Sequence, residues 1–324
     1  MRRVLSRLAA GSGWVAVVPV VALSLAMAAP AHAQLNTQHL KGAVGLKSGS
    51  QPPPGGYIAA PVLYFYSTDD VRDREGTRLP FTADLDISMF GVGYLHVTNK
   101  KILGGNYAFQ ALFPVGANNR IQGTEIDANP GAGLTDSVVA PIILGWHSKR
   151  ADALANYTIY IPTGRYTDGA SDNTGFGMWG HEVNFGTTAY LNEARQYHAA
   201  TTVSWLYSTK KEDSNTQPGT EMHLEGGVGG DFLKGGLAVG LSYYAGFKLT
   251  DDDIEGLPGI LIRGKNRSFA LGPEASLAIA RGNTVYGFVR VAYFFETYAR
   301  TTTKGGALFI TGTFLTKPLK IPAP

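Results

Sequence analysis

The chain has 324 residues, a formal net charge of +3 at pH 7 and only 16% charged side chains. It contains no basic stripe or RNA-binding aromatic motif, which argues against a nucleic-acid partner. Cysteine is absent, which excludes disulfides and thiolate chemistry, and the 41 glycines, 16 tyrosines and 15 phenylalanines are typical of a β-rich chain.

Residues 1–33 have the layout of a cleavable secretory signal. Basic residues up to Arg7 precede an apolar run from Trp14 to Met27, and the small-residue motif AHA at 31–33 comes just before Gln34. The apolar run is shorter than the roughly 20 residues that a membrane span needs, so a membrane anchor is the less favoured interpretation. We therefore predict export through a cleaved signal.

Residues 34–56 are rich in glycine and proline and show no alternation of apolar and polar side chains. One interpretation is a periplasmic lead-in without fixed structure. The other is an ordered plug folded into the domain that follows, because a run of prolines does not readily join a sheet. The sequence leaves both open.

Residues 57–316 alternate between apolar and polar side chains with a period of two, interrupted by turn residues. Many of the alternating runs reach the roughly 9 to 11 residues of a tilted membrane strand, whereas soluble strands average about 5 to 6. We expect an all-β fold, a transmembrane antiparallel up-and-down β-barrel of about twelve strands, with a tail at 317–324. The predicted strands are 57–67, 84–97, 102–115, 136–147, 151–163, 178–191, 196–208, 219–231, 235–249, 266–280, 283–299 and 305–316.

The connections between these strands alternate in length. Outer-membrane barrels with both termini in the periplasm have short periplasmic turns and longer external loops in this order, so we predict insertion in a bacterial outer membrane. The acid-bearing loops are suited to solvent and to divalent ions that bridge them to lipopolysaccharide. The short turns are 98–101, 147–150, 192–195, 233–236 and 281–283, and the long loops are 67–81, 117–136, 164–175 and 250–264.

The outward faces of two strands predict an aromatic girdle at the membrane interface. Its members are Tyr197, Trp205, Tyr207, Tyr293 and Phe295. Charged residues excluded from lipid are expected to point into the lumen and to pair with one another. This polar lumen set is Glu221, His223, Glu225, Lys248, Arg290 and Glu296.

The same alternation assigns six aromatic residues to the lumen, where they could form an apolar slide for aromatic solutes or simply fill space. They are Tyr160, Tyr244, Tyr286, Phe288, Phe294 and Tyr298. Glu221, His223 and Glu225 alternate on one face and could hold a divalent metal, but ordinary ion pairing is favoured. We therefore expect neither a metal nor another cofactor.

Four segments carry a resemblance to a known family: GLKSGSQPPPGGY (45–57), VVAPIILGWHSKRADALANYTIYIPTGRY (138–166), LAVGLSYYAGFKLTDD (237–252) and RSFALGPEASL (267–277). They resemble the outer-membrane proteins of the phenol meta-pathway degradation family. The WH turn followed by YxPTGxY is the most specific part. The resemblance implies a channel for aromatic or other hydrophobic compounds, and it transfers no site residues.

The sequence thus predicts a passive channel for small hydrophobic, aromatic compounds that feed a catabolic pathway, and not an enzyme. His198 and Ser204 share a predicted inward face but lie six residues apart, roughly 20 Å, which is too far for a nucleophile and its base. The alternative is a structural or adhesive barrel with a closed lumen. The chain also runs past Phe314, so Phe309 or Phe314 is expected to act as an internal signal for the outer-membrane insertion machinery.

Overall fold

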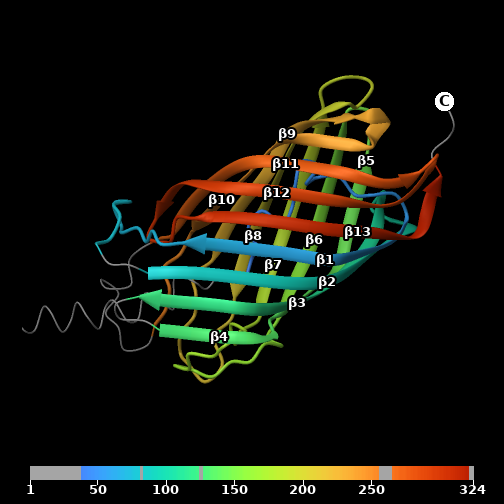
Figure 1. Cartoon of the computed structure of the whole chain (residues 1–324). Helices are drawn as coiled ribbons and strands as arrows, with labels where there is room; N and C mark the ends of the chain where they lie inside the picture. Colours follow the sequence, from blue (N-terminus) through green and yellow to red (C-terminus); the bar gives the residue numbers. More distant parts are fainter. Residues whose placement is uncertain (1–37, 81–82, 124–126, 255–264, 321–324) are drawn as a thin grey trace, which may run out of the picture.

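The computed structural model describes residues 38–80, 83–123, 127–254 and 265–320, so the predicted signal at 1–33 and the last residues of the predicted tail, 321–324, lie outside it. The described chain forms a 13-stranded antiparallel sheet that closes on itself (Figure 1). The strands are β1 (Gly55–Thr68), β2 (Ala83–Ile102), β3 (Gly105–Gly123), β4 (Asp127–Leu134), β5 (Ser137–His147), β6 (Ala151–Ile161), β7 (Gly180–Tyr190), β8 (Tyr197–Ser208), β9 (Glu221–Phe232), β10 (Leu237–Lys248), β11 (Arg267–Arg281), β12 (Thr284–Arg300) and β13 (Gly306–Lys320). A single 3₁₀ turn within these ranges, η1 (Leu233–Gly235), joins β9 to β10. None of the described helical turns is long and apolar enough to cross a membrane.

Twelve of the strands form the barrel wall. Neighbours in the chain pair with each other, and β13 pairs with β1, which closes the ring. In the described part of the chain β4 pairs only with the C-terminal part of β3, while the N-terminal part of β3 pairs with β5. The predicted all-β barrel of about twelve strands is confirmed. β4 is an additional strand where a loop was expected, because β3 continues past the barrel rim and leaves backbone groups that β4 pairs.

Side-chain alternation separates an inner from an outer face on most strands. Along β7, Glu182, Asn184 and Thr188 are buried, whereas Val183 and Phe185 between them are exposed. This is the period of two that a strand between an enclosed interior and a surrounding medium requires. One face of each strand therefore builds the interior.

β-Bulges reverse this alternation at both ends of β12. The register slips between Val285 and Gly287 against β13, and again opposite Phe269 of β11. Tyr286 and Tyr298 are consequently exposed on the outer surface, at 42% and 47%. The prediction that these two tyrosines face the lumen is wrong, since one extra residue in a bulge turns the following side chains to the other face.

The last strand is longer than predicted. β13 continues to Lys320, and its end pairs with β12 through Leu319 and Lys320. Residues 317–320, predicted as part of a tail, belong to the wall. Of the two expected insertion signals, Phe314 is exposed on the outer surface and Phe309 is buried in the interior.

Close packing between β11 and β12 depends on one glycine. A Cβ at Gly272 would come within 1.6 Å of the carbonyl oxygen of Tyr293, so the backbone of β12 would have to move. We expect Gly272→Ala to lower the free energy of unfolding by about 1–3 kcal/mol. Gly91→Ala is the matched control, because its nearest atom is the flexible end of Leu112 at 3.3 Å. Urea unfolding in lipid vesicles, followed by tryptophan fluorescence, measures both variants. Equal stabilities would contradict the prediction.

Candidate functional site in the barrel interior

Residues 38–54 lie inside the barrel before β1 begins, and we call them the luminal segment. Gln38 Nε2 donates to the Met178 carbonyl at 2.9 Å, at the end of the barrel that carries the long loops. Ser50 donates to Asp152 at the opposite end, which carries the short turns. The segment thus crosses the lumen from the loop end to the turn end. Of the two interpretations that the sequence leaves open for residues 34–56, the ordered plug describes the position of residues 38–54.

The luminal segment is held at the loop end by a buried carboxyl group between β4 and β5. Asp136 accepts hydrogen bonds from the backbone N–H groups of Phe176 (3.1 Å) and Gly164 (3.3 Å), and from Gln38 Nε2 at 3.5 Å. Burial raises the pKa of Asp136 above its ordinary value, although these bonds favour the ionised form. This buried carboxyl group therefore connects the loop end of the luminal segment to the long loops.

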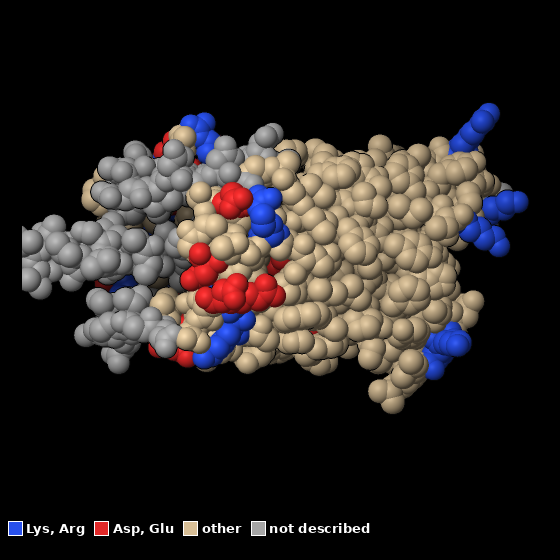
Figure 2. All heavy atoms as spheres, turned by 90° about the horizontal axis from the view of Figure 1, so that it is seen from below, with Lys and Arg blue, Asp and Glu red and all other residues tan. Residues whose placement is uncertain are grey.

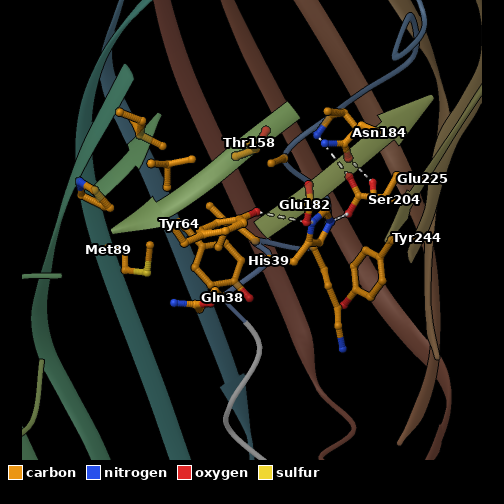
Figure 3. Close-up of a pocket in the computed structure, with 18 of the residues that line it drawn as sticks. Gln38, His39, Tyr64, Met89, Thr158, Glu182, Asn184, Ser204, Glu225 and Tyr244 are labelled. Atoms are coloured by element: carbon orange, nitrogen blue, oxygen red, sulfur yellow. Dashed lines mark hydrogen bonds and ion pairs between the residues drawn. The ribbon is translucent and has the colours of Figure 1, made fainter. Parts of the chain in front are cut away.

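His39 forms the central anchor of the segment (Figure 3). Its Nδ1 lies 2.7 Å from Glu182 Oε2, and its Nε2 lies 3.1 Å from Glu225 Oε1. Only the imidazolium form carries a proton on both nitrogens, so the cation satisfies both carboxylates. The ring stacks on His223 with a centroid distance of 4.1 Å, and His223 Nε2 lies 3.2 Å from Glu221 Oε2. One cation of the luminal segment is thus enclosed by acidic residues of β7 and β9.

Carboxylates of the wall also bind the backbone of the luminal segment. The Gly42 N–H donates to Glu225 Oε1 at 2.6 Å, and the Leu46 N–H donates to Glu274 Oε1 at 3.2 Å. Arg290 Nη2 donates to Glu274 Oε2 at 2.9 Å and to the Gly42 carbonyl at 3.0 Å. These bonds satisfy backbone groups that have no sheet partner.

The six predicted polar lumen residues are placed in the interior by the structure. Five of them are at most 8% exposed, and the side chain of Arg290 is 16% exposed. Lys248 pairs with Asp252 at 2.7 Å, and Glu296 accepts from Tyr66 at 2.9 Å and from Tyr244 at 3.0 Å. Among the described residues no group of three or more His, Cys, Asp or Glu could hold a metal ion.

The predicted aromatic lumen residues do not form one continuous row. Tyr160 and Tyr244 line the cavity of the lumen. Phe294 is fully buried against Tyr244, with a centroid distance of 5.2 Å, and Phe288 is half-buried away from the cavity. Tyr286 and Tyr298 are outside, as described above. The five predicted girdle residues are all exposed on the outer surface, on β8 and β12.

A cavity of about 640 Å³ remains between the luminal segment and the wall. Its two sides differ in chemistry. The large aliphatic side chains contributed by the strands all come from β2, β3, β5 and β6, and they are Leu85, Ile87, Met89, Leu95, Leu112, Val138, Ile143 and Leu154. The side chains from β7 to β12 that reach the cavity are Glu182, Asn184, Thr202, Ser204, Glu225, Tyr244 and Glu296. The apolar half of the lumen therefore faces the open space, and the luminal segment covers much of the polar half.

Three interior residues were not predicted from the sequence, although the alternation of side chains contains a signal for two of them. Alternation in GHEVNFGTTAY places Glu182 on the inward face, and alternation in RSFALGPEASL does the same for Glu274. His39 had none, because it precedes the first strand in a segment without periodicity.

Comparison with known protein families identifies the family to which this chain belongs. The family described as "Putative MetA-pathway of phenol degradation" matches residues 68–311. The chain belongs to this family. A comparison with curated protein sequences finds no match.

Among solved structures, the COG4313 outer membrane channel from Pseudomonas putida is similar with a TM-score of 0.66 and 13% identity, over 82% of this chain and 97% of that one. The β domain of the Bordetella autotransporter BrkA has a TM-score of 0.43 and 13% identity, over 81% and 99%. The first match shows that this phenol-degradation family member has the fold of an outer-membrane barrel. In that class the short turns are periplasmic and the long loops are external.

The bond between Glu225 and the luminal segment can be tested directly. We expect Glu225→Gln to speed hydrogen exchange at the Gly42 and Val44 amides by about tenfold to a hundredfold, because both donate to this carboxylate and a charged acceptor is worth roughly 1.5–3 kcal/mol. Glu221→Gln is the matched control, since Glu221 lies beside His223 and accepts no bond from the segment backbone. Hydrogen exchange read by mass spectrometry measures both. Unchanged protection in Glu225→Gln would show that this carboxylate does not hold the segment.

Proposed function

We propose that this protein is a passive outer-membrane channel for small hydrophobic compounds, aromatic ones in particular, that serve as substrates for degradation inside the cell. The division of the lumen carries the proposal. Aliphatic residues of β2, β3, β5 and β6 face the cavity, while much of the charge on β7 to β12 is engaged by the luminal segment. A hydrophobic solute gains roughly 25 cal/mol for each Å² of apolar surface that it removes from water against such a wall.

The size of the cavity supports this class of solute. An apolar cavity of about 150 Å³ stays dry and binds benzene, so a cavity of about 640 Å³ has room for a substituted ring. Tyr160, Tyr244 and the nearby Tyr64 add aromatic faces to the lining. A sugar would need many hydrogen-bond partners, and the strands that carry the aliphatic side chains offer few, chiefly Gln110, Asn119, Asn156 and Thr158.

The comparisons support the same proposal in general terms. The family description refers to phenol degradation, and the similar Pseudomonas structure is described as an outer membrane channel. No GxxxxGK[ST] motif for nucleotide binding occurs in the sequence. The driving force is therefore the concentration gradient that degradation inside the cell maintains.

The proposal is tested by initial uptake of micromolar labelled phenol and toluene in deletion and complemented cells with intact outer membranes, with glucose as the control solute. Faster uptake of the aromatic compounds alone on complementation is the expected result. No difference for any solute, with the protein shown to be in the outer membrane, would overturn it in favour of a structural barrel with a closed lumen.

The aliphatic wall gives a residue-level prediction. Leu112 lines the cavity from β3, and Leu112→Asn places an amide where a hydrophobic solute must pass. We expect toluene uptake to slow by about tenfold, because desolvating an unpaired amide costs roughly 1–3 kcal/mol. Leu112→Met preserves volume and apolar character and should retain the normal rate. Rates are compared at equal amounts of protein in the membrane. Normal uptake by the Asn variant would mean that solutes do not follow this wall.

A further inference from the structure

The turn end of the barrel is strongly basic. Its cations are Lys100, Lys101, Lys149, Arg150, Arg195, Lys234, Arg281, Lys317 and Lys320, and we call this set the basic rim. Glu193 is the only acidic side chain in the described connections at this end. On the face seen in Figure 2, Lys and Arg project from this end without any Asp or Glu, whereas both signs occur at the loop end.

Most of the rim cations have no partner in the protein. Arg150 pairs with Glu193 at 3.1 Å, and Arg195 pairs with Asp152 at 2.8 Å. The remaining rim side chains are exposed and form no ion pair or hydrogen bond with any residue that the structure describes. At the loop end both signs occur, and four pairs form between neighbouring charges: Asp70 with Arg72, Asp69 with Arg78, Arg165 with Asp172 and Lys248 with Asp252.

The rim lies just below the aromatic residues of the outer surface. Phe232 packs edge-on against Tyr197, with centroids 6.4 Å apart, and Lys234 follows two residues later. Phe314 is exposed three residues before Lys317. A tilted strand advances about 2.5 Å along the barrel axis for each residue. The rim cations therefore stand roughly at the level of lipid head groups beneath an aromatic girdle.

Large leucines accompany the cations at the turns. Leu103 and Leu233 are 86% and 74% exposed, and each has a φ of 50°, a left-handed conformation that leucine rarely adopts. A turn facing only water would favour Asn or Gly at such positions. An apolar side chain next to a lysine instead suits the boundary between head groups and acyl chains, where both parts find a compatible environment.

We propose that the basic rim binds the phosphate groups of anionic phospholipids, such as phosphatidylglycerol or cardiolipin, in the periplasmic leaflet. The unpaired cations lie on four different hairpins and on the end of β13, spread around the closed ring. A protein partner would contact one sector of such a ring, whereas membrane lipid surrounds all of it. The inference depends on the outer-membrane placement and not on the identity of the transported solute.

Trp146 provides a local probe for the test. It lies three residues before Lys149, and its Nε1 donates to the Leu103 carbonyl at 3.0 Å. Replacing Trp179 and Trp205 by Phe leaves Trp146 as the only tryptophan after residue 33. The protein is reconstituted in phosphatidylethanolamine vesicles that contain brominated phosphatidylglycerol or brominated phosphatidylethanolamine. Quenching of Trp146 then reports which lipid occupies the rim.

We expect brominated phosphatidylglycerol to bind roughly fivefold more strongly than brominated phosphatidylethanolamine, the ratio that about 1 kcal/mol, the contribution of a single cation near the surface, gives. The preference should disappear in the combined variant Lys100→Gln, Lys101→Gln and Lys149→Gln. It should persist in a charge-matched control at the loop end, Arg74→Gln, Lys210→Gln and Arg267→Gln. Equal quenching by both lipids in the parent protein, or an unchanged preference in the rim variant, would overturn the proposal and leave a periplasmic protein as the partner to seek.

Discussion

Pairing between buried carboxylates and the luminal segment is the interaction on which the interior depends. Glu182, Glu225 and Glu274 sit inside a wall whose outer face is apolar, and an unpaired buried carboxylate costs several kcal/mol. His39, Arg290 and backbone N–H groups of the segment supply the compensating charge and hydrogen bonds. The segment and the strands from β7 to β12 therefore stabilise each other, since Glu182 and Glu225 take their cationic partner, His39, from the segment.

This pairing also determines the chemistry of the cavity that remains in the lumen. Because the segment lies against the charged wall, it pairs with carboxylates of that wall and leaves the aliphatic wall uncovered. A segment fixed to the opposite wall would have produced the reverse, a charged passage with its aliphatic side chains covered. The preference proposed for hydrophobic solutes thus follows from which half of the barrel the segment covers, more than from any single residue of the lining.

Strand alternation made much of the wall predictable and little of the interior pairing. A period of two is enough to place the exposed side chains of Tyr197 and Trp205 on one face of β8 and the buried side chains of His198 and Ser204 on the other face. It fails at Tyr286 and Tyr298, because a bulge is a local insertion that changes the phase without changing composition. His39 was beyond prediction, since its partners on β7 and β9 are 143 and 186 residues away in the chain.

Charged side chains are paired differently in the interior, in the loops and at the basic rim. Several interior carboxylates are paired with the luminal segment, several loop charges are paired with each other, and most rim cations have no partner among the described residues. Asp152 connects two of these zones, because it accepts bonds from Ser50 of the luminal segment and from Arg195 of the rim. Lys149 belongs to the turn that leads into the strand of Asp152. The turn end of the luminal segment and the basic rim therefore share one buried carboxylate, which ties the fixed position of the segment to the same end of the barrel as the rim.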